Sequence, residues 1–181
     1  MNRRNFVQLL TVGSGATLNG FRLPFSSSSL TESYLHDKKA KELRADVVIA
    51  GGGLGGCSAA LAALRNNLTV ILTEETDWIG GQLTQQGVPP DEHQSIESHG
   101  ATQLYRDFRK AVREYYFRHY PLTAPARSEK YFNPGNGAVS RLAHEPRVAL
   151  AVLQNLFAPY LSSKKLTLLL EHKVTGADIT G

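Results

Sequence analysis

Cysteine is nearly absent from this sequence of 181 residues, in which Cys57 is the only one. A single thiol excludes an intramolecular disulfide, and it excludes a zinc or iron–sulfur site built from cysteines of this stretch alone. Cys57 follows a glycine cluster at the predicted start of a helix, so a reactive, low-pKa thiol is one interpretation. The favoured interpretation is a small buried residue that packs helix against sheet.

The sequence also lacks long apolar runs and an excess of charge in its predicted folded part. No run approaches the roughly 18 apolar residues of a membrane-spanning helix, so no such segment is expected. The formal net charge is +4, but seven Lys/Arg against three Asp/Glu precede residue 45, and thirteen of each follow. A domain with equal numbers of basic and acidic residues lacks the excess of basic charge that is typical of nucleic-acid-binding proteins. With 41% hydrophobic and 20% charged residues, the composition is typical of a soluble globular protein.

Glycine, in contrast, is concentrated in residues 51–56, which read GGGLGG. Glycine inside a regular element costs roughly 0.5–1 kcal/mol relative to alanine, so this cluster needs a local reason. The preceding ADVVIA is typical of a strand buried in a parallel sheet, and the following residues 54–64 are rich in the helix formers alanine and leucine. A flexible linker would not be bracketed by two buried elements.

The pattern G-x-G-x-x-G is met by Gly51, Gly53 and Gly56 at this strand-to-helix junction, which is the context of a dinucleotide-binding fingerprint. Gly51 permits the tight turn, Gly53 lets the backbone approach a pyrophosphate, and Gly56 allows close packing of helix on sheet. Ala60, one turn later, is expected to serve the same packing. The N–H groups and partial positive charge of the helix N-terminus favour phosphate. The alternative is a tight βα turn that binds nothing.

Residues 67–73 predict a second buried strand, and Glu74 stands at its end, 23 positions after Gly51. An acid about 20 residues after the first glycine is placed to bind a ribose diol, and it disfavours a 2′-phosphate such as that of NADP. Glu75 is an adjacent competitor for this role, and Glu74 is preferred because it directly follows the strand.

Beyond residue 82 the sequence predicts a long polar loop over 83–99, a helix over 101–119 and, after proline, a helix from 146 to about 161. Long loops within compact domains tend to be functional. The NPGNG of residues 133–137 is strong turn chemistry. A third strand is expected over 165–170, followed by the start of a hairpin over 173–180.

Residues 1–20, with Arg3 and Arg4 ahead of a modest hydrophobic stretch, resemble a twin-arginine export signal, and residues 21–44 are interpreted as a linker. This interpretation predicts export to the periplasm or cell envelope. The alternative is a chance basic N-terminus on a cytoplasmic protein. The domain proper is expected over residues 45–181.

The chain resembles the FAD-dependent oxidoreductases of the glutathione-reductase-like class, and specifically proteins related to the flavin subunit of heterodisulfide reductase. The motifs that carry the resemblance are DVVIAGGGLGG, VILTEETDWIGGQL, QQGVPPDEH and NPGNGAVSRLAHEPRVAL. The second is the most informative, because an acid at the end of a strand followed six positions later by Gly-Gly separates FAD-binding folds from plain NAD dehydrogenases. The implied fold class is α/β: a three-layer, Rossmann-like FAD/NAD(P)-binding domain with a parallel sheet, incomplete at its C-terminus.

The resemblance implies a bound FAD and a set of residues around it. Glu74 would bind the adenosine ribose, and Val174, in a strand after KLTLLL, would meet the adenine with its backbone. Three residues of the polar loop are candidates for substrate contact or catalysis, although solvated surface charges explain them nearly as well: Asp91, Glu92 and His93. The FAD pyrophosphate would lie along Gly51, Gly52, Gly53, Gly55, Gly56, Gly80, Gly81 and Gln82.

Arg141 and His144 are placed to face the cofactor, with capping and surface pairing as the favoured interpretation. No metal site is expected within this chain, although relatives of the heterodisulfide reductase type can carry iron–sulfur clusters.

The function expected from the resemblance is hydride or electron transfer through flavin, between an unknown small-molecule substrate and an unknown acceptor. Because members of the family are much longer, the chain is expected to be the N-terminal portion of such an enzyme. Two alternatives stay open: an NAD-binding dehydrogenase with the same βαβ element, and a truncated, non-catalytic remnant.

Overall fold

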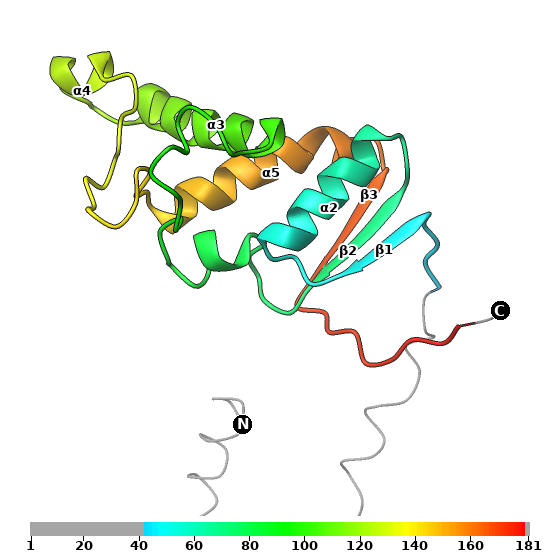
Figure 1. Ribbon diagram of the computed structural model, residues 1–181. Helices are drawn as coiled ribbons and strands as arrows, with labels where there is room; N and C mark the ends of the chain where they lie inside the picture. The colour runs from blue at the N-terminus through cyan, green and yellow to red at the C-terminus, as the bar shows by residue number, and fades with distance from the viewer. Residues whose placement is uncertain (1–41, 180–181) are drawn as a thin grey trace, which may run out of the picture. The chain divides into compact units, whose positions relative to one another are not determined.

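A computed structural model describes residues 42–179 of the chain (Figure 1). Residues from Leu43 onward form one compact unit. The predicted signal segment of residues 1–20 and nearly all of the predicted linker lie outside the described residues. Within residues 42–179, no helix combines the length and the apolar character that a membrane crossing requires.

The sheet consists of three parallel strands in the order β1-β2-β3, namely Val47–Ala50, Val70–Glu74 and Leu166–Leu170. The ends of the three strands differ by at most three residues from the ranges that their apolar, β-branched sequences predict. Each is separated from the next by at least one helix, as a parallel connection requires. The α/β class with a parallel sheet is therefore confirmed.

The main helices are α2 (Leu54–Arg65), α3 (Gln103–His119) and α5 (Pro146–Ser162). A short helix, α4 (Ala124–Ser128), and a single 3₁₀ turn, η2 (Gly81–Leu83), complete the described elements. The side chain of Thr102 caps α3 by accepting from the N–H of Tyr105 at 3.3 Å. Proline starts α5 at a position where its missing N–H costs nothing.

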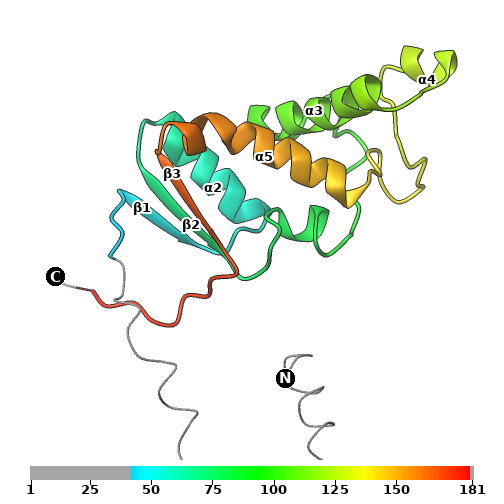
Figure 2. The same cartoon turned by 180° about the vertical axis from the view of Figure 1, so that it is seen from behind.

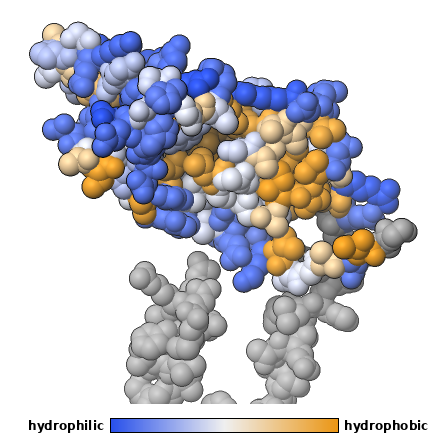
Figure 3. Space-filling model, in the orientation of Figure 1, coloured by the Kyte–Doolittle hydropathy of each residue, from blue (hydrophilic) through white to orange (hydrophobic). Residues whose placement is uncertain are grey.

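The hydrophobic core lies between one face of the sheet and the helices. The register pairs Val47 with Val70 and Val70 with Leu166, and these side chains pack with α2, α3 and α5 in a single cluster. Figures 1 and 2 show α2 and α5 together on this side of the sheet, with α3 beyond them. The other face presents Val48, which is 62% exposed. Figure 3 shows apolar residues gathered around α2. A groove beside this helix is lined by Leu54 and Leu61 of α2 and Leu156 of α5, among others.

The hairpin expected over residues 173–180 is wrong for the part that is described, because residues 172–179 contain no strand. Glu171 adopts a left-handed conformation with φ of 56°, which turns the chain at the end of β3. The N–H groups of Glu171 and His172 then donate to the carbonyls of Thr76 and Glu74, at 3.1 and 2.9 Å. The segment after β3 therefore crosses the end of β2 and does not continue as a strand.

Candidate functional site

Two glycine segments, residues 51–56 and 80–81, lie side by side at the carboxyl end of the sheet. The N–H of Gly80 donates to the carbonyl of Gly52 at 2.7 Å, and Gly53 and Gly80 form an isolated parallel bridge. This edge of a parallel sheet is where open α/β folds bind their ligands. The structure thus brings together the two motifs that the sequence separates by more than twenty residues.

Most of these glycines have a reason that lies within the protein. Gly51 and Gly80 have φ values of 97° and 105°, which side-chain-bearing residues rarely adopt. A Cβ on Gly56 would lie 1.9 Å from the carbonyl oxygen of Gly51, so the helix can approach the turn only without one. A Cβ on Gly81 would press on the Cα of Gly53 at 3.1 Å.

Gly53 differs from these four. Its φ is −61°, which any residue adopts, and a Cβ placed on it would meet no atom within 4 Å. No neighbouring protein atom and no backbone strain therefore require glycine at this position. The space in front of Gly53, at the N-terminus of α2, fits a group that must approach the backbone closely, and a pyrophosphate is such a group.

Glu74 ends β2 with its side chain turned back to the glycine turn. It is 8% exposed, and one carboxylate oxygen accepts from the N–H of Gly52 at 2.9 Å. The other oxygen accepts from both the N–H and the hydroxyl of Thr76, each at 2.9 Å. The carboxylate is therefore held in one orientation beside the first glycines, and the oxygen facing Gly52 retains capacity to accept a hydroxyl.

The remaining residues considered for cofactor binding are exposed. Glu75, the competitor of Glu74, is exposed and forms a surface ion pair with Lys173 at 3.9 Å. Gln82 is exposed in η2, next to Gly80 and Gly81. Val174 is expected in a strand, but it lies in the irregular segment after β3 and is 46% exposed.

Cys57 is buried in the first turn of α2. Its thiol donates to the carbonyl of Gly52 at 3.2 Å, and burial raises its pKa to about 12. A thiol with a raised pKa is protonated and a poor nucleophile. The structure therefore favours the packing interpretation over the reactive one.

The three candidates from the polar loop do not converge. Asp91 and His93 are exposed, and His93 accepts from the N–H of Ser95 at 3.2 Å. Glu92 points inward, with a side chain only 4% exposed, and it pairs with Arg109 and accepts from the hydroxyl of Tyr105. The description of all three as solvated surface charges is thus wrong for Glu92.

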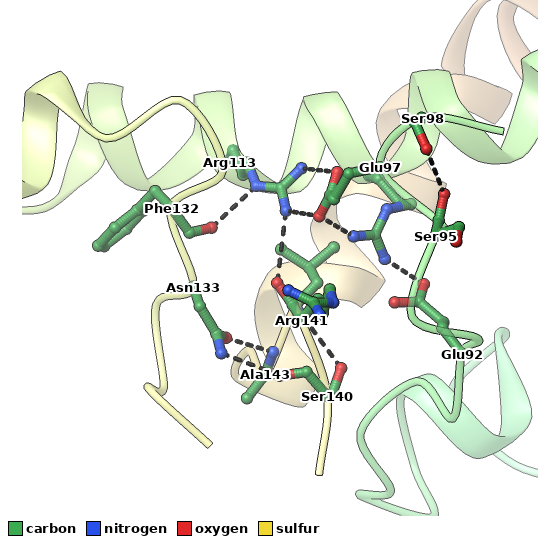
Figure 4. A network of polar contacts seen from close by, with 12 residues as sticks. Glu92, Ser95, Glu97, Ser98, Arg113, Phe132, Asn133, Ser140, Arg141 and Ala143 are labelled. Atoms are coloured by element: carbon green, nitrogen blue, oxygen red, sulfur yellow. Dashed lines mark hydrogen bonds and ion pairs between the residues drawn. The ribbon is translucent and has the colours of Figure 1, made fainter. Parts of the chain in front are cut away.

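Glu92 belongs to an ionic network that fastens the loop to α3 (Figure 4). Arg109, 2% exposed, bridges Glu92 and Glu97, and Arg113 pairs with Glu97 as well. Arg113 also donates to the carbonyl of Phe132 at 2.8 Å, which ties the next loop to the same helix. Burial alone would raise the pKa of Glu97, but the hydrogen bonds and charges of Arg113 and Arg109 outweigh burial and lower it.

His144 and Arg141 do not cap α5, whose N-cap residue is Glu145. The ring of His144 lies edge-on to Phe108, and its Nδ1 is 2.9 Å from the carbonyl of Leu142. Burial lowers the pKa of His144. Among the described residues, the buried side-chain atoms without a partner are Nε2 of His144 and Oε2 of Glu92.

The sequence analysis missed Arg109 and Arg113, although a signal for them exists. They are four positions apart in α3 and fall among the apolar residues Phe108, Val112 and Tyr116, all of which are buried. Arginine within the apolar stripe of a helix requires buried acceptors, and acidic residues occur in the preceding loop. No cluster of three His, Cys, Asp or Glu residues that could hold a metal ion occurs in residues 42–179.

Comparison with known proteins gives a consistent result. The model of a family described as FAD dependent oxidoreductase matches residues 46–181. A carotenoid phi-ring synthase of Chlorobaculum tepidum is 32% identical over 112 residues, which cover 55% of this chain and 17% of that protein. The chain thus spans less than a fifth of the curated relative that it matches. No solved structure matches the chain.

Proposed function

The chain belongs to the FAD dependent oxidoreductase family, and from this premise we propose that residues 45–181 bind FAD as part of an oxidoreductase. The single observation that carries the proposal is the open space in front of Gly53, where neither φ nor a neighbouring atom requires glycine. Open space alone does not distinguish Gly53, since Gly55 and Gly176 face it as well; its place at the N-cap of α2, where helix N–H groups favour a phosphate, does.

In this proposal the pyrophosphate lies along the glycines of residues 51–56 and 80–81, with Gln82 at the rim. The N-terminus of α2 supplies free N–H groups and about half a positive charge, so no basic side chain is needed. Glu74 accepts hydroxyl donors of the adenosine ribose, in the orientation that Gly52 and Thr76 impose. When bound, the flavin supplies hydride or electron transfer, and the protein groups bind and orient it.

We also propose the finer assignment to the glutathione-reductase-like class, related to the flavin subunit of heterodisulfide reductase. The support is the sequence spacing of six positions between Glu74 and the doublet Gly80–Gly81. Both also contact Gly52 of the first glycine segment, Glu74 through its carboxylate and Gly80 through its N–H. An NAD-binding dehydrogenase does not require that second glycine segment. Substrate contact by Asp91 or His93 stays part of the proposal, because both are exposed on the loop next to α2.

Replacing Gly53 tests the proposal. The full chain, purified or refolded with excess FAD, should show visible flavin absorbance and a melting temperature raised by FAD but not by NAD. Gly53→Val should fold normally, because the added Cβ meets no protein atom. It should bind FAD about tenfold more weakly, which is a loss of about 1.4 kcal/mol in the free energy of binding.

Gly176→Val is the matched control, because Gly176 also has no atom within 4 Å of an added Cβ and belongs to neither glycine segment. It should retain FAD fully. A folded chain without flavin, or unchanged FAD content in Gly53→Val, would overturn the proposal.

A further inference from the structure

A second cavity lies between the polar loop and the segment that follows α4. Its volume is about 700 Å³, and it is lined by Glu92, Gln94 and Glu97 on one side and by residues of the range 129–141 on the other. Its lining is mainly polar, in contrast to the apolar groove between α2 and α3. None of its lining residues belongs to the glycine segments, so it is separate from the proposed FAD site.

Glu92 provides a buried acceptor at this cavity. One of its carboxylate oxygens accepts from Arg109 and Tyr105, while the other, Oε2, is buried without a partner. In Figure 4 the carboxylate of Glu92 faces the segment that carries Ser140 and Arg141, across the cavity. A buried acceptor without a donor costs free energy, so this oxygen calls for a ligand that donates a hydrogen bond.

The charges around the cavity favour a neutral donor over a cation. Arg109 pairs with both Glu92 and Glu97, and Arg113 pairs with Glu97. The other charged lining residues, Glu129 and Arg141, have opposite signs. Both oxygens of Glu97 are already engaged, since Oε2 accepts from Arg113 at 3.2 Å and Oε1 pairs with both arginines. A hydroxyl satisfies Oε2 of Glu92 without adding an uncompensated charge.

Other groups at the cavity have free hydrogen-bonding capacity. The side-chain amides of Gln94 and Asn136 make no hydrogen bond with any described residue, and each amide can both donate and accept. Tyr131 adds an aromatic ring that is 42% exposed. Amides and an aromatic face beside a buried carboxylate match a molecule that carries several hydroxyls on an apolar frame.

The wall opposite Glu92 is held in shape before any ligand arrives. The side chain of Asn133 donates to the carbonyls of Gly137 and Ser140 at 3.2 and 2.9 Å, and it accepts from the N–H of Ala143 at 2.7 Å. These bonds close the turn that the NPGNG motif begins (Figure 4). A preformed wall lowers the ordering cost of binding.

We propose that this cavity binds a neutral, hydroxyl-rich small molecule such as a sugar or polyol, with Glu92 as the buried acceptor for one of its hydroxyls. The inference goes beyond FAD binding and does not depend on it, because the two sites share no residue.

Ligand-observed NMR with the full chain tests the proposal. The probes are D-glucose, myo-inositol and glycerol, with methylammonium and acetate as the charged comparisons. At least one polyol should show saturation transfer that Glu92→Gln weakens about tenfold, because the amide replaces an acceptor with a donor. Glu114→Gln, the same change at a carboxylate that does not line the cavity and forms surface ion pairs only, should leave the signal unchanged.

A second variant keeps the test decisive if Glu92→Gln unfolds. Gln94→Ala removes a side chain that makes no hydrogen bond with the described residues, so it should keep the melting temperature while it weakens polyol binding severalfold. No saturation transfer from any of the three polyols, or equal binding in Gln94→Ala, would overturn the proposal. Flavin absorbance recorded on the same samples shows separately whether the FAD site is loaded.

Discussion

The glycine segments and the ionic network fix neighbouring parts of the chain by opposite means. At residues 51–56 and 80–81 the contacts are between backbones, and they exist because side chains are missing; the N–H of Gly80 approaches the carbonyl of Gly52 to 2.7 Å. At α3 the contacts are between long charged side chains, with Arg109 2% exposed between Glu92 and Glu97. The first arrangement leaves space in front of a backbone, and the second fills space with paired charges.

This difference predicts how each region fails. A backbone site tolerates no added atom where chain meets chain, whereas a buried ion pair tolerates no removed partner. The difference also separates ligand binding from stability. The glycine segments present free N–H groups to a ligand, whereas the side chains of the ionic network pair almost all of their hydrogen-bonding atoms with one another.

Removing Arg109 should have the largest effect. Arg109→Met leaves the buried carboxylate of Glu92 without its cation, and breaking such a pair costs about 3–5 kcal/mol in the free energy of unfolding. Urea denaturation followed by circular dichroism measures it. Lys110→Met, at the exposed neighbouring position, should change stability by less than about 0.5 kcal/mol. Equal losses in the two variants would show that the network is not a stabilising element.

Adding a methyl group to Gly56 should have an intermediate effect. Gly56→Ala places a Cβ 1.9 Å from the Gly51 carbonyl oxygen, and such overpacking costs about 1–3 kcal/mol. Gly55→Ala, one residue earlier in the same helix, meets no atom within 4 Å and should be neutral or stabilise by up to about 1 kcal/mol. Thermal melts of both variants without FAD make the comparison; a stable Gly56→Ala would contradict the geometry of the turn.

The smallest effect is expected at Glu97, and it should depend on pH. Arg113 and Arg109 hold the pKa of Glu97 below its usual 4.5, so its stabilisation is present above pH 4.5 and is lost as the pH falls through the lower folded value. Glu97→Gln should therefore cost on the order of 1 kcal/mol at neutral pH and progressively less in acid.

Unfolding midpoints measured from neutral pH to about pH 3 check this expectation. Glu114→Gln, at a carboxylate with surface ion pairs only, should lose much less at neutral pH. A Glu97→Gln deficit that grows as the pH falls would reverse the predicted sign.

The sequence predicted the parallel sheet, the three long helices and the glycine turn, because these depend on local signals. β-branched runs, helical spacing and the missing Cβ of Gly51 and Gly56 act over a few residues. It failed after β3, where the left-handed turn at Glu171 and the bonds of His172 to Glu74 decide the course of the chain.

Within the candidate site, the sequence identified which residues form the glycine turn and the acid that follows it. Only the tertiary structure decided that Gly53 faces open space, that Glu92 is buried and that Arg109 holds it. Local steric and conformational preferences are properties of a short segment, so the sequence carries them directly. The state of a buried charge depends on partners that the fold brings from 12 to 17 positions away along the chain, and those partners exist only once the helix and the loop have packed.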